Sequence, residues 1–372
     1  MKLTFFKTAC LAFIVLIAAA CGNDGKMTVT VSNNSQFDRE GETVEIPWER
    51  IAGKLSTIAA ADIVVTGKNG EQIPSQVIFN GEPSPKSVIF QVDLPAGEKA
   101  KYKIFSGVRE DYKPMVFGRF VPERLDDYAW ENNLAAFRIY GPALERELVT
   151  NGIDYWSKTT PELIINKWYA EGHYHDDKGE GNDCYKVGVT LGAGASAPFI
   201  GDTLRFSRNF AAWETLDNGP IRTTVRLTYA PFDAGGKTVS FTKTISLDAN
   251  SRFNKITDVF TGDFDTIPVA AGVVIHDGAR LMSGMNYIAV GEPASDSKTG
   301  LDGDTFVAVI MDGLKKNHFG GNYLAVGKAV KDEPFVYHMG AGTSKADVVM
   351  DDVWIEMIRR ATERLKEPLV VK

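Results

Sequence analysis

The densest group of chemically active side chains in this sequence lies between positions 167 and 194. Two of the five histidines of the chain, His173 and His175, stand two residues apart there. They are surrounded by acids and phenols at Tyr169, Glu171, Tyr174, Asp176, Asp177, Glu180, Asp183 and Tyr185. The segment is rich in glycine, which disfavours helix, so we predict a loop between strands. Loops on a rigid scaffold often carry catalytic residues, although a merely solvated polar loop is the alternative.

These residue types suit an elimination reaction on a uronic acid. The carboxylate must be neutralised by a cation, and Arg138 or Lys167 is a candidate for this role. A base must then remove the proton from the neighbouring carbon, and histidine, with an unperturbed pKa of about 6.5, is suited to that step. A tyrosine would protonate the leaving oxygen. The predicted catalytic residues are His173, His175, Tyr174, Tyr169 and Tyr185.

Two other chemistries fit the same segment. A divalent cation, Ca²⁺ or Zn²⁺, would be bound by oxygen and imidazole ligands, and the candidate ligands are His173, His175, Asp176 and Asp183. Hydrolysis by paired carboxylates needs two acids about 5 to 9 Å apart across a sugar, and the candidate acids are Glu131, Asp176, Asp177, Glu180 and Asp183. No other cofactor is predicted.

Aromatic and polar residues alternate in the preceding segments, 121–142 and 151–158. A sugar ring has an apolar face and a rim of hydroxyls, so such mixtures favour a sugar site. The alternative is that the tryptophans fill a core. The predicted substrate-binding residues, including cations and histidines from later strands, are Arg124, Trp130, Glu131, Asn132, Arg138, Trp156, Lys167, Arg222, His276 and His338.

The N-terminus resembles a lipoprotein leader. A short basic region precedes an apolar run that ends at Cys21, and the run is too short to span a membrane. We expect a signal peptide over 1–20, lipidation of Cys21 and a tether over 21–26, which would anchor the protein to a membrane in the periplasm or at the outer membrane. The alternative is an ordinary secreted protein. With Cys10 removed in the signal peptide and Cys21 lipidated, only Cys184 would remain as a free thiol. The fold therefore needs a large core without disulfides.

The pattern of residues in the rest of the chain indicates a mainly β protein. Short alternating strands over 27–107 indicate a small N-terminal β-sandwich, which contains no histidine or cysteine. We interpret it as a structural or docking module without a catalytic group of its own. Longer strands over 108–372 indicate a large antiparallel sheet with one wet face. One amphipathic helix is predicted at 351–365. The net charge of −7 argues against nucleic acid as a partner, and we expect a monomer.

Several motifs resemble a known family. They are Arg124-Leu-Asp-Asp-Tyr-Ala-Trp-Glu-Asn-Asn, Ala136-Phe-Arg-Ile-Tyr-Gly-Pro-Ala, Gly152-Ile-Asp-Tyr-Trp, His173-Tyr-His-Asp-Asp-Lys-Gly-Glu-Gly-Asn-Asp and Asn218-Gly-Pro-Ile-Arg. The chain resembles a lipoprotein family of unknown function from Bacteroidetes, found among polysaccharide-utilisation systems. The resemblance implies a galactose-mutarotase-like β-supersandwich, a fold shared by sugar epimerases and polysaccharide lyases, and a glycan ligand that contains uronic acid. It implies no catalytic assignment.

The favoured hypothesis is a lyase or dehydratase that eliminates across a uronic acid in an oligosaccharide or polysaccharide. The alternatives are a lipid-anchored glycan-binding protein without catalysis and a glycoside hydrolase with paired carboxylates. We expect the pocket on the concave face of the large sheet, under the segment 167–194.

Overall fold

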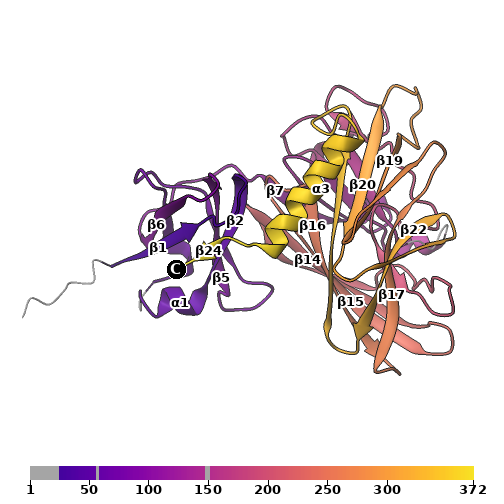
Figure 1. Cartoon of the computed structure of the whole chain (residues 1–372), viewed down its shortest axis with the longest axis horizontal. Coiled ribbons are helices and arrows are strands. Elements are labelled where there is room, and N and C mark those ends of the chain that lie inside the picture. Colours follow the sequence, from indigo (N-terminus) through magenta and orange to yellow (C-terminus); the bar gives the residue numbers. More distant parts are fainter. Residues whose placement is uncertain (1–24, 56–57, 147–150) are drawn as a thin grey trace, which may run out of the picture.

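The computed structural model describes residues 25–55, 58–146 and 151–372. The predicted leader and the lipidation site Cys21 lie outside these residues. The chain forms a small N-terminal β unit and a larger β unit, and helix α3 (Asp351–Lys366) runs beside the junction between them (Figure 1). Within the described residues, no helix is long and apolar enough to cross a membrane.

The N-terminal unit is a sandwich of two antiparallel sheets. One sheet has the order β24-β1-β6-β3, and the other has the order β2-β5-β4. The strands are β1 (Lys26–Ser32), β2 (Arg39–Pro47), β3 (Ile63–Thr66), β4 (Ser75–Ile78), β5 (Ser87–Leu94), β6 (Lys99–Ser106) and β24 (Val370–Val371). Their alternating residues, such as Val29, Phe90 and Ile104, form a separate buried core. Helix α1 (Trp48–Ala52) contributes Ile51 to it.

The C-terminus returns to this N-terminal sandwich. Val371 lies opposite Val31 in an antiparallel pair, and Thr30 and Lys372 exchange backbone hydrogen bonds of 2.8 and 2.9 Å. The predicted domain boundary at residue 107 therefore assigns β24 to the wrong unit. A strand of two residues is too short to show the alternation of buried and exposed side chains in the sequence. Two crossings of the chain link the units.

The larger unit is built on an eight-stranded antiparallel sheet. Its order is β13-β14-β15-β16-β23-β20-β19-β18. The strands are β13 (Ala212–Asn218), β14 (Arg222–Asp233), β15 (Thr238–Asp248), β16 (Phe253–Gly262), β18 (Arg280–Ser283), β19 (Tyr287–Pro293), β20 (Asp304–Ile310) and β23 (Pro334–Thr343). Successive side chains point to opposite faces, so Val225 and Leu227 are buried while the flanking Arg226 is partly exposed.

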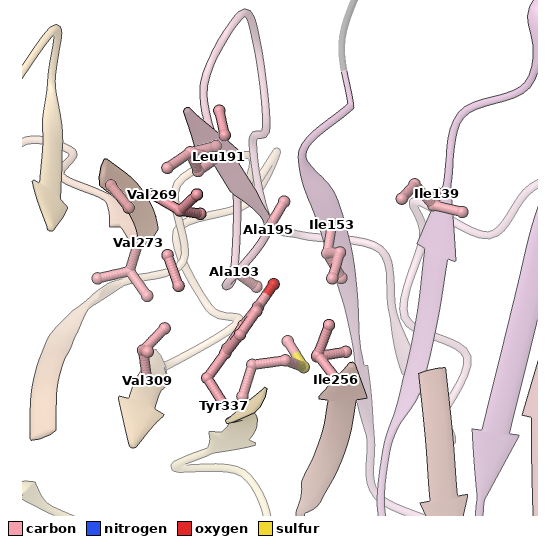
Figure 2. Packing of buried hydrophobic residues seen from close by; sticks show 14 of the residues in the cluster. Ile139, Ile153, Leu191, Ala193, Ala195, Ile256, Val269, Val273, Val309 and Tyr337 are labelled. Atoms are coloured by element: carbon pink, nitrogen blue, oxygen red, sulfur yellow. The ribbon is translucent and has the colours of Figure 1, made fainter. Parts of the chain in front are cut away.

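Two smaller sheets pack against the inner face of the eight-stranded sheet. The five-stranded sheet contains β11 (Gly181–Asn182), β10 (Ile153–Lys158), β9 (Ala136–Ile139), β8 (Asp127–Asn132) and β7 (Val116–Val121). The four-stranded sheet contains β12 (Ser196–Pro198), β17 (Thr266–Val274), β22 (Asn322–Val330) and β21 (Lys315–Phe319). Figure 2 shows side chains of the three sheets meeting in one core, where Ile153, Val269 and Ile256 each come from a different sheet.

Helix α3 lies on the outer face of the eight-stranded sheet. Trp354 and Ile358 are fully buried against Phe306 and Ala308 of β20. The acidic first turn and basic last turn suit the helix dipole. The predicted amphipathic helix and the mainly β fold class are thus confirmed. The helix covers only part of this outer face, and the rest remains open.

The other helical segments are short. They are α2 (Ile165–Glu171) and three 3₁₀ turns, η1 (Ala60–Asp62), η2 (Pro122–Arg124) and η3 (Pro142–Arg146).

Candidate functional site

A groove of about 1090 Å³ lies on the open part of the outer face of the eight-stranded sheet. Its floor is formed by β14, β15, β16 and β23, and α3 forms one wall with Met357 and Arg360. The N-terminal unit forms the other wall, with Glu45, Lys86 and Asp93. This volume is slightly above the range for small-molecule sites, about 300–1,000 Å³, so the groove has room for several sugar rings.

The floor carries one transverse row of side chains set by the strand register. Thr224 lies opposite Ser246, Ser246 opposite Lys255, Lys255 opposite His338, and His338 opposite Ile310. Directly opposed residues in a sheet point to the same face, so all five side chains face the groove. The Thr224 and Ser246 hydroxyls are 3.2 Å apart. The row combines hydroxyls, a cation and an imidazole, all suited to sugar hydroxyls and acidic groups.

Lys255 and His338 form the polar centre of this row. Lys255 is exposed and makes no ion pair with any described residue. The pKa of His338 is lowered to about 4, because burial disfavours the charged ring and the neighbouring Lys255 repels a second positive charge. His338 is therefore neutral at pH 7 and able to accept a proton.

The arginines of the groove are already paired. Arg222 donates to Asp248 at 2.6 and 2.9 Å and to Glu45 at 2.8 Å. Arg252 pairs with Asp347, and Arg226 pairs with Glu214 at 3.2 Å. These pairs neutralise three of the acids that line the groove, Asp248, Glu45 and Asp347.

Asp217, the acid on strand β13 at the edge of the groove, is hydrogen-bonded to backbone groups. The carboxylate of Asp217 accepts hydrogen bonds from the N–H groups of Phe79 and Asn80 at 2.8 and 2.9 Å. Among the described residues of the floor, the charge without an ion pair is that of Lys255, which favours an anionic group there. The N-terminal wall carries Lys86 together with two acids that make no ion pair with any described residue, Glu40 and Asp93.

An aromatic ring closes the groove near α3. Phe253 lines the groove and stacks on Trp354 with ring centroids 5.4 Å apart and an interplanar angle of 7°. Ile310 and Met357 lie beside it. This end therefore offers the apolar surface that a sugar face needs.

The segment 167–194 does not form the predicted continuous loop. Residues 165–171 form helix α2, which ends at Gly172 with φ of 68°. A left-handed glycine is a common helix C-cap, so this glycine stops a helix and does not prevent one. Lys167 lies on the exposed side and pairs with Glu180 at 2.7 Å.

The two histidines lie in a turn, not in an extended strand. The N–H of Asp176 donates to the carbonyl of His173 at 3.2 Å. His173 is exposed, whereas Tyr174 turns inward and stacks on Trp156 at 5.0 Å. The side chain of His175 is 38% exposed, and its Nδ1 lies 3.0 Å from the carbonyl of Asp183. The imidazoles thus share no face directed at a cavity.

The predicted neighbours Arg124, Arg138, Tyr174 and Asp183 do come together. The Tyr174 hydroxyl accepts from Arg124 at 3.2 Å and from Arg138 at 3.5 Å. Arg138 also donates to Asp183 at 3.0 Å and to Asp154 at 2.6 Å. However, Arg138 is only 4% exposed.

The space beside this cluster is very small. A hollow of about 10 Å³ adjoins Tyr174 and His173, which is at the lower limit for one water molecule. The cluster lies on the face of the five-stranded sheet that points away from the main core, so the groove is on the opposite side of the protein. A sugar does not fit here without movement of the segment.

Two predicted catalytic tyrosines lie inside the protein. Tyr169 is 8% exposed and Tyr185 is 2% exposed. Burial raises the pKa of both phenols well above the usual value. As placed here, neither hydroxyl can reach a sugar in the groove, and both rings instead contribute to packing.

Trp130 and Asn132 are structural in this conformation. Trp130 is 1% exposed, and its indole N–H donates to Asn254 at 2.7 Å. The Asn132 amide donates to the carbonyls of Asp248 and Ser251 at 2.7 and 2.6 Å. These bonds fix the rim of the groove but contact no ligand space.

Glu131 and Trp156 are also buried. Glu131 accepts from Lys158 at 2.8 Å and from the first N–H groups of α2, at Ile164 and Ile165. Trp156 is 1% exposed and packs under Tyr174. The alternative interpretation, that the tryptophans fill a core, describes Trp130 and Trp156.

Of the predicted substrate-binding residues, only Arg222 and His338 line the groove. His276 lies elsewhere, with Nδ1 2.6 Å from Glu292 and Nε2 2.8 Å from the carbonyl of Lys186. Both ring nitrogens are therefore engaged in a structural bridge.

The predicted metal ligands are dispersed. Among the described residues, no group of three His, Cys, Asp or Glu side chains is arranged to hold a metal ion. Asp176 pairs with Lys298 at 3.0 Å, and His175 lies 3.6 Å from Asp183.

The sequence interpretation missed Lys255 and Lys86. The signal for Lys255 is present, because residues 253–262 alternate and place Lys255 and Thr257 on the polar face. Lys86 has no such signal, since its position depends on the packing of the two units.

These features define a two-unit, antiparallel β protein with a polar groove at the junction. The chain belongs to a family described as a domain of unknown function, DUF4861, whose model matches residues 31–371. This confirms the predicted resemblance to a family of unknown function. The chain is also similar to "Uncharacterized protein P7" from Formosa agariphila, with 34% identity over 270 residues that cover 67% of each protein.

Two solved structures from Enterococcus faecalis share limited similarity in fold. One is a protein in glycosyl hydrolase family 38, with a TM-score of 0.47, 9% identity and coverage of 94% of this chain and 47% of that chain. The other is an alpha-mannosidase, with a TM-score of 0.45, 8% identity and coverage of 94% and 46%. The present chain thus spans about half the length of each.

Proposed function

We propose that this protein is carbohydrate-active and that an acidic glycan binds in the groove, where it undergoes elimination by a lyase or dehydratase reaction. The observation that carries the proposal is the pair on the groove floor, Lys255 opposite His338. One is an unpaired cation and the other an imidazole that is neutral at pH 7.

The lining of the groove supports a glycan as the ligand. Hydroxyls of Thr224 and Ser246 and the ring of Phe253 match the hydroxyl rim and apolar face of a pyranose. The unpaired ammonium of Lys255 favours a carboxylate on that ring. A uronic acid provides all three complementary features.

The elimination would use these two residues in sequence. Lys255 would neutralise the uronate carboxylate and so make the proton on the adjacent carbon, C5, more acidic. His338 would take that proton. The C5–H electron pair would form the C4–C5 double bond, and the C4–O bond would break, with the leaving oxygen protonated by water. A bound carboxylate also offsets the repulsion from Lys255 and therefore raises the pKa of His338 toward a value useful for a base.

Ultraviolet absorbance tests the reaction directly. Uronate-containing oligosaccharides would be incubated with the protein, and the new carbon–carbon double bond would be followed. His338→Gln should abolish the signal, whereas His318→Gln, at an exposed histidine on β21, should retain it. Elimination is ruled out if no absorbance develops with any uronate oligosaccharide that binds.

A glycan-binding protein without catalysis is the second candidate. One observation favours it: the residues that line the groove include no tyrosine to protonate a leaving oxygen. Tight binding without a new double bond or new reducing ends would support this candidate. Hydrolysis by paired carboxylates has less support, because four of the six acids that line the groove are held by arginines or by backbone N–H groups: Glu45, Asp217, Asp248 and Asp347. New reducing ends without absorbance would support hydrolysis.

We also propose that the protein is a lipid-anchored member of a bacterial polysaccharide-utilisation system. The support is the leader-like sequence that ends at Cys21. Metabolic labelling with a radioactive fatty acid should mark the full-length protein, and Cys21→Ala should abolish the label and release the protein from membranes. Equal labelling of both proteins would contradict the anchor.

A further inference from the structure

The N-terminal unit forms a wall of the groove and is not only a scaffold. The outer face of its sheet β2-β5-β4 contributes Glu45, Ile78 and Asp93 to the lining, and the residue before β5 contributes Lys86. Burial raises the pKa of Glu45, but the nearby cations Arg222 and Lys255, together with a hydrogen bond from Ser87, lower it overall. Glu45 and Lys255 line the same groove, so this wall faces the floor residue at the centre of the groove.

Specific hydrogen bonds fix this wall relative to the floor. The Gln76 side chain accepts from the N–H groups of Ile221 and Arg222 at 2.8 and 2.7 Å and donates to the Arg222 carbonyl at 2.9 Å. Gln91 donates to the carbonyl of Ala249 at 2.7 Å. Ile78 and Ile89 pack against Ile221 in a small buried cluster. Hydrogen bonds and apolar packing therefore fix the position of this wall relative to the floor.

The backbone of Lys86 is fixed on this wall by hydrogen bonds, whereas its side chain is exposed. Its N–H donates to the carbonyl of Ile78 at 2.8 Å, and its carbonyl accepts from Trp48 at 2.8 Å. The side chain is exposed and lines the groove, with no ion pair to any described residue. Glu45, an acid of the neighbouring strand β2, is already bound to Ser87 and Arg222.

We propose that Lys86 is a specificity-determining residue that binds a second acidic group of the ligand. This inference rests on the proposed function of the groove. Lys255 on the floor and Lys86 on the N-terminal wall are unpaired cations contributed by different units. A single uronate ring fills only part of about 1090 Å³, so one ring engages one of these lysines. The preferred ligand is therefore an oligosaccharide with acidic groups on more than one ring.

Calorimetry with ligands of different length tests this inference. The probes are galacturonic acid, digalacturonate and tetragalacturonate, and the equivalent series from a guluronate or mannuronate polymer. The variants are Lys86→Gln and Lys255→Gln, and the control is Lys101→Gln, at an exposed lysine on β6 of the same unit. Both test lysines are exposed, so a thermal melt should show that each variant folds like the wild type.

The expected results differ between the two lysines. Lys86→Gln should weaken tetramer binding about tenfold and leave monosaccharide binding unchanged, since a charged hydrogen bond contributes about that much. Lys255→Gln should weaken binding of every length. If Lys86→Gln binds the tetramer as tightly as the control does, or if the wild type binds monomer and tetramer equally, the inference about Lys86 is overturned while the groove proposal stands. If the wild type binds none of the probes, the proposed function itself is overturned.

Discussion

Lys255 on β16 and His338 on β23 are directly opposed in the antiparallel register of the eight-stranded sheet. Both side chains point to the outer face, where the N-terminal unit and α3 leave a groove. The ammonium of Lys255 helps to hold the pKa of His338 well below its usual range, after the larger effect of burial. A cation and a neutral base are thus placed side by side on the floor of this groove.

The lowered pKa of His338 predicts a pH-dependent stability. In the folded state the pKa is about 4, against 6.5 for an unperturbed histidine. The unfolded state therefore binds more protons between these values, so stability should fall as the pH drops from 6.5 toward 4. The loss should be on the order of 2 kcal/mol. His338→Gln should remove this part of the pH dependence in urea unfolding, and identical slopes for variant and wild type would contradict the assignment.

Buried Asp127 predicts a stabilising substitution. It is fully buried, its carboxylate makes no hydrogen bond to a described side chain, and the Nε atom of Arg138 is 3.9 Å away. The N–H of Gly141 and the charges of Arg138 and Arg124 stabilise the charged form only in part. Burial raises its pKa to about 6. Its favourable protonated state is present at low pH and is lost as the pH rises through about 6, so the folded protein carries a costly buried charge at pH 7.5.

Asp127→Asn should therefore raise the free energy of unfolding at pH 7.5 by roughly 1–3 kcal/mol. The gain should shrink toward pH 4, where the wild-type carboxyl is already neutral. Asp126→Asn, at the partly exposed neighbouring residue, serves as the control and should change little. A loss of stability at pH 7.5 would mean that the carboxylate is needed to balance Arg138 or Arg124.

Alternation and helical periodicity in the sequence predicted much of the scaffold. In β14 the apolar Val225 and Leu227 are buried, while Arg222 and Arg226 face the groove. Helix α3 was predicted over 351–365 and spans Asp351–Lys366. These features are local, because a strand or helix face is defined by residues two to four positions apart. Helix α2 was not predicted, because the glycines of the segment 167–194 disfavour helix. The helix itself contains no glycine, and Gly172 only ends it.

The site was harder to predict because its parts are distant in sequence. Glu131 looked like a ligand contact, but it forms a buried ion pair with Lys158, 27 positions away, and no local pattern indicates such a pair. Lys86 and Lys255 meet at the groove only because the two units pack together. Clusters of charged, histidine and tyrosine residues in a sequence indicate an active site, yet buried polar networks have the same composition.

Substitution of Arg222 tests how much the ion pairs at the junction between the two units contribute to stability. It joins Asp248 in a bidentate pair and also reaches Glu45 of the N-terminal unit at 2.8 Å. Bidentate charged pairs are among the stronger polar contacts, and removing the cation leaves two carboxylates close together. Arg222→Met should lower the free energy of unfolding by about 2 kcal/mol.

The matched control is Arg226→Met on the same strand. Arg226 makes one pair with exposed Glu214 at 3.2 Å, and exposed pairs contribute less than about 1 kcal/mol. Urea unfolding of both variants measures the difference. Equal effects would show that the link between the units does not depend on Arg222.

The return of the C-terminus to the N-terminal unit predicts a selective loss of stability on truncation. Removing residues 369–372 deletes β24 and takes Leu369 and Val371 away from the N-terminal core. It also exposes the backbone groups of Thr30, which exchange hydrogen bonds with Lys372, along an edge strand. Amide exchange in β1 and β6 should therefore accelerate by at least about tenfold, as expected for the loss of roughly 1.4 kcal/mol, while β14 to β16 stay protected. Leu365→Ala, at a half-exposed residue of α3 that leaves β24 in place, should leave exchange in β1 unchanged. Unaltered protection of β1 in the truncated protein would show that β24 does not stabilise this sheet.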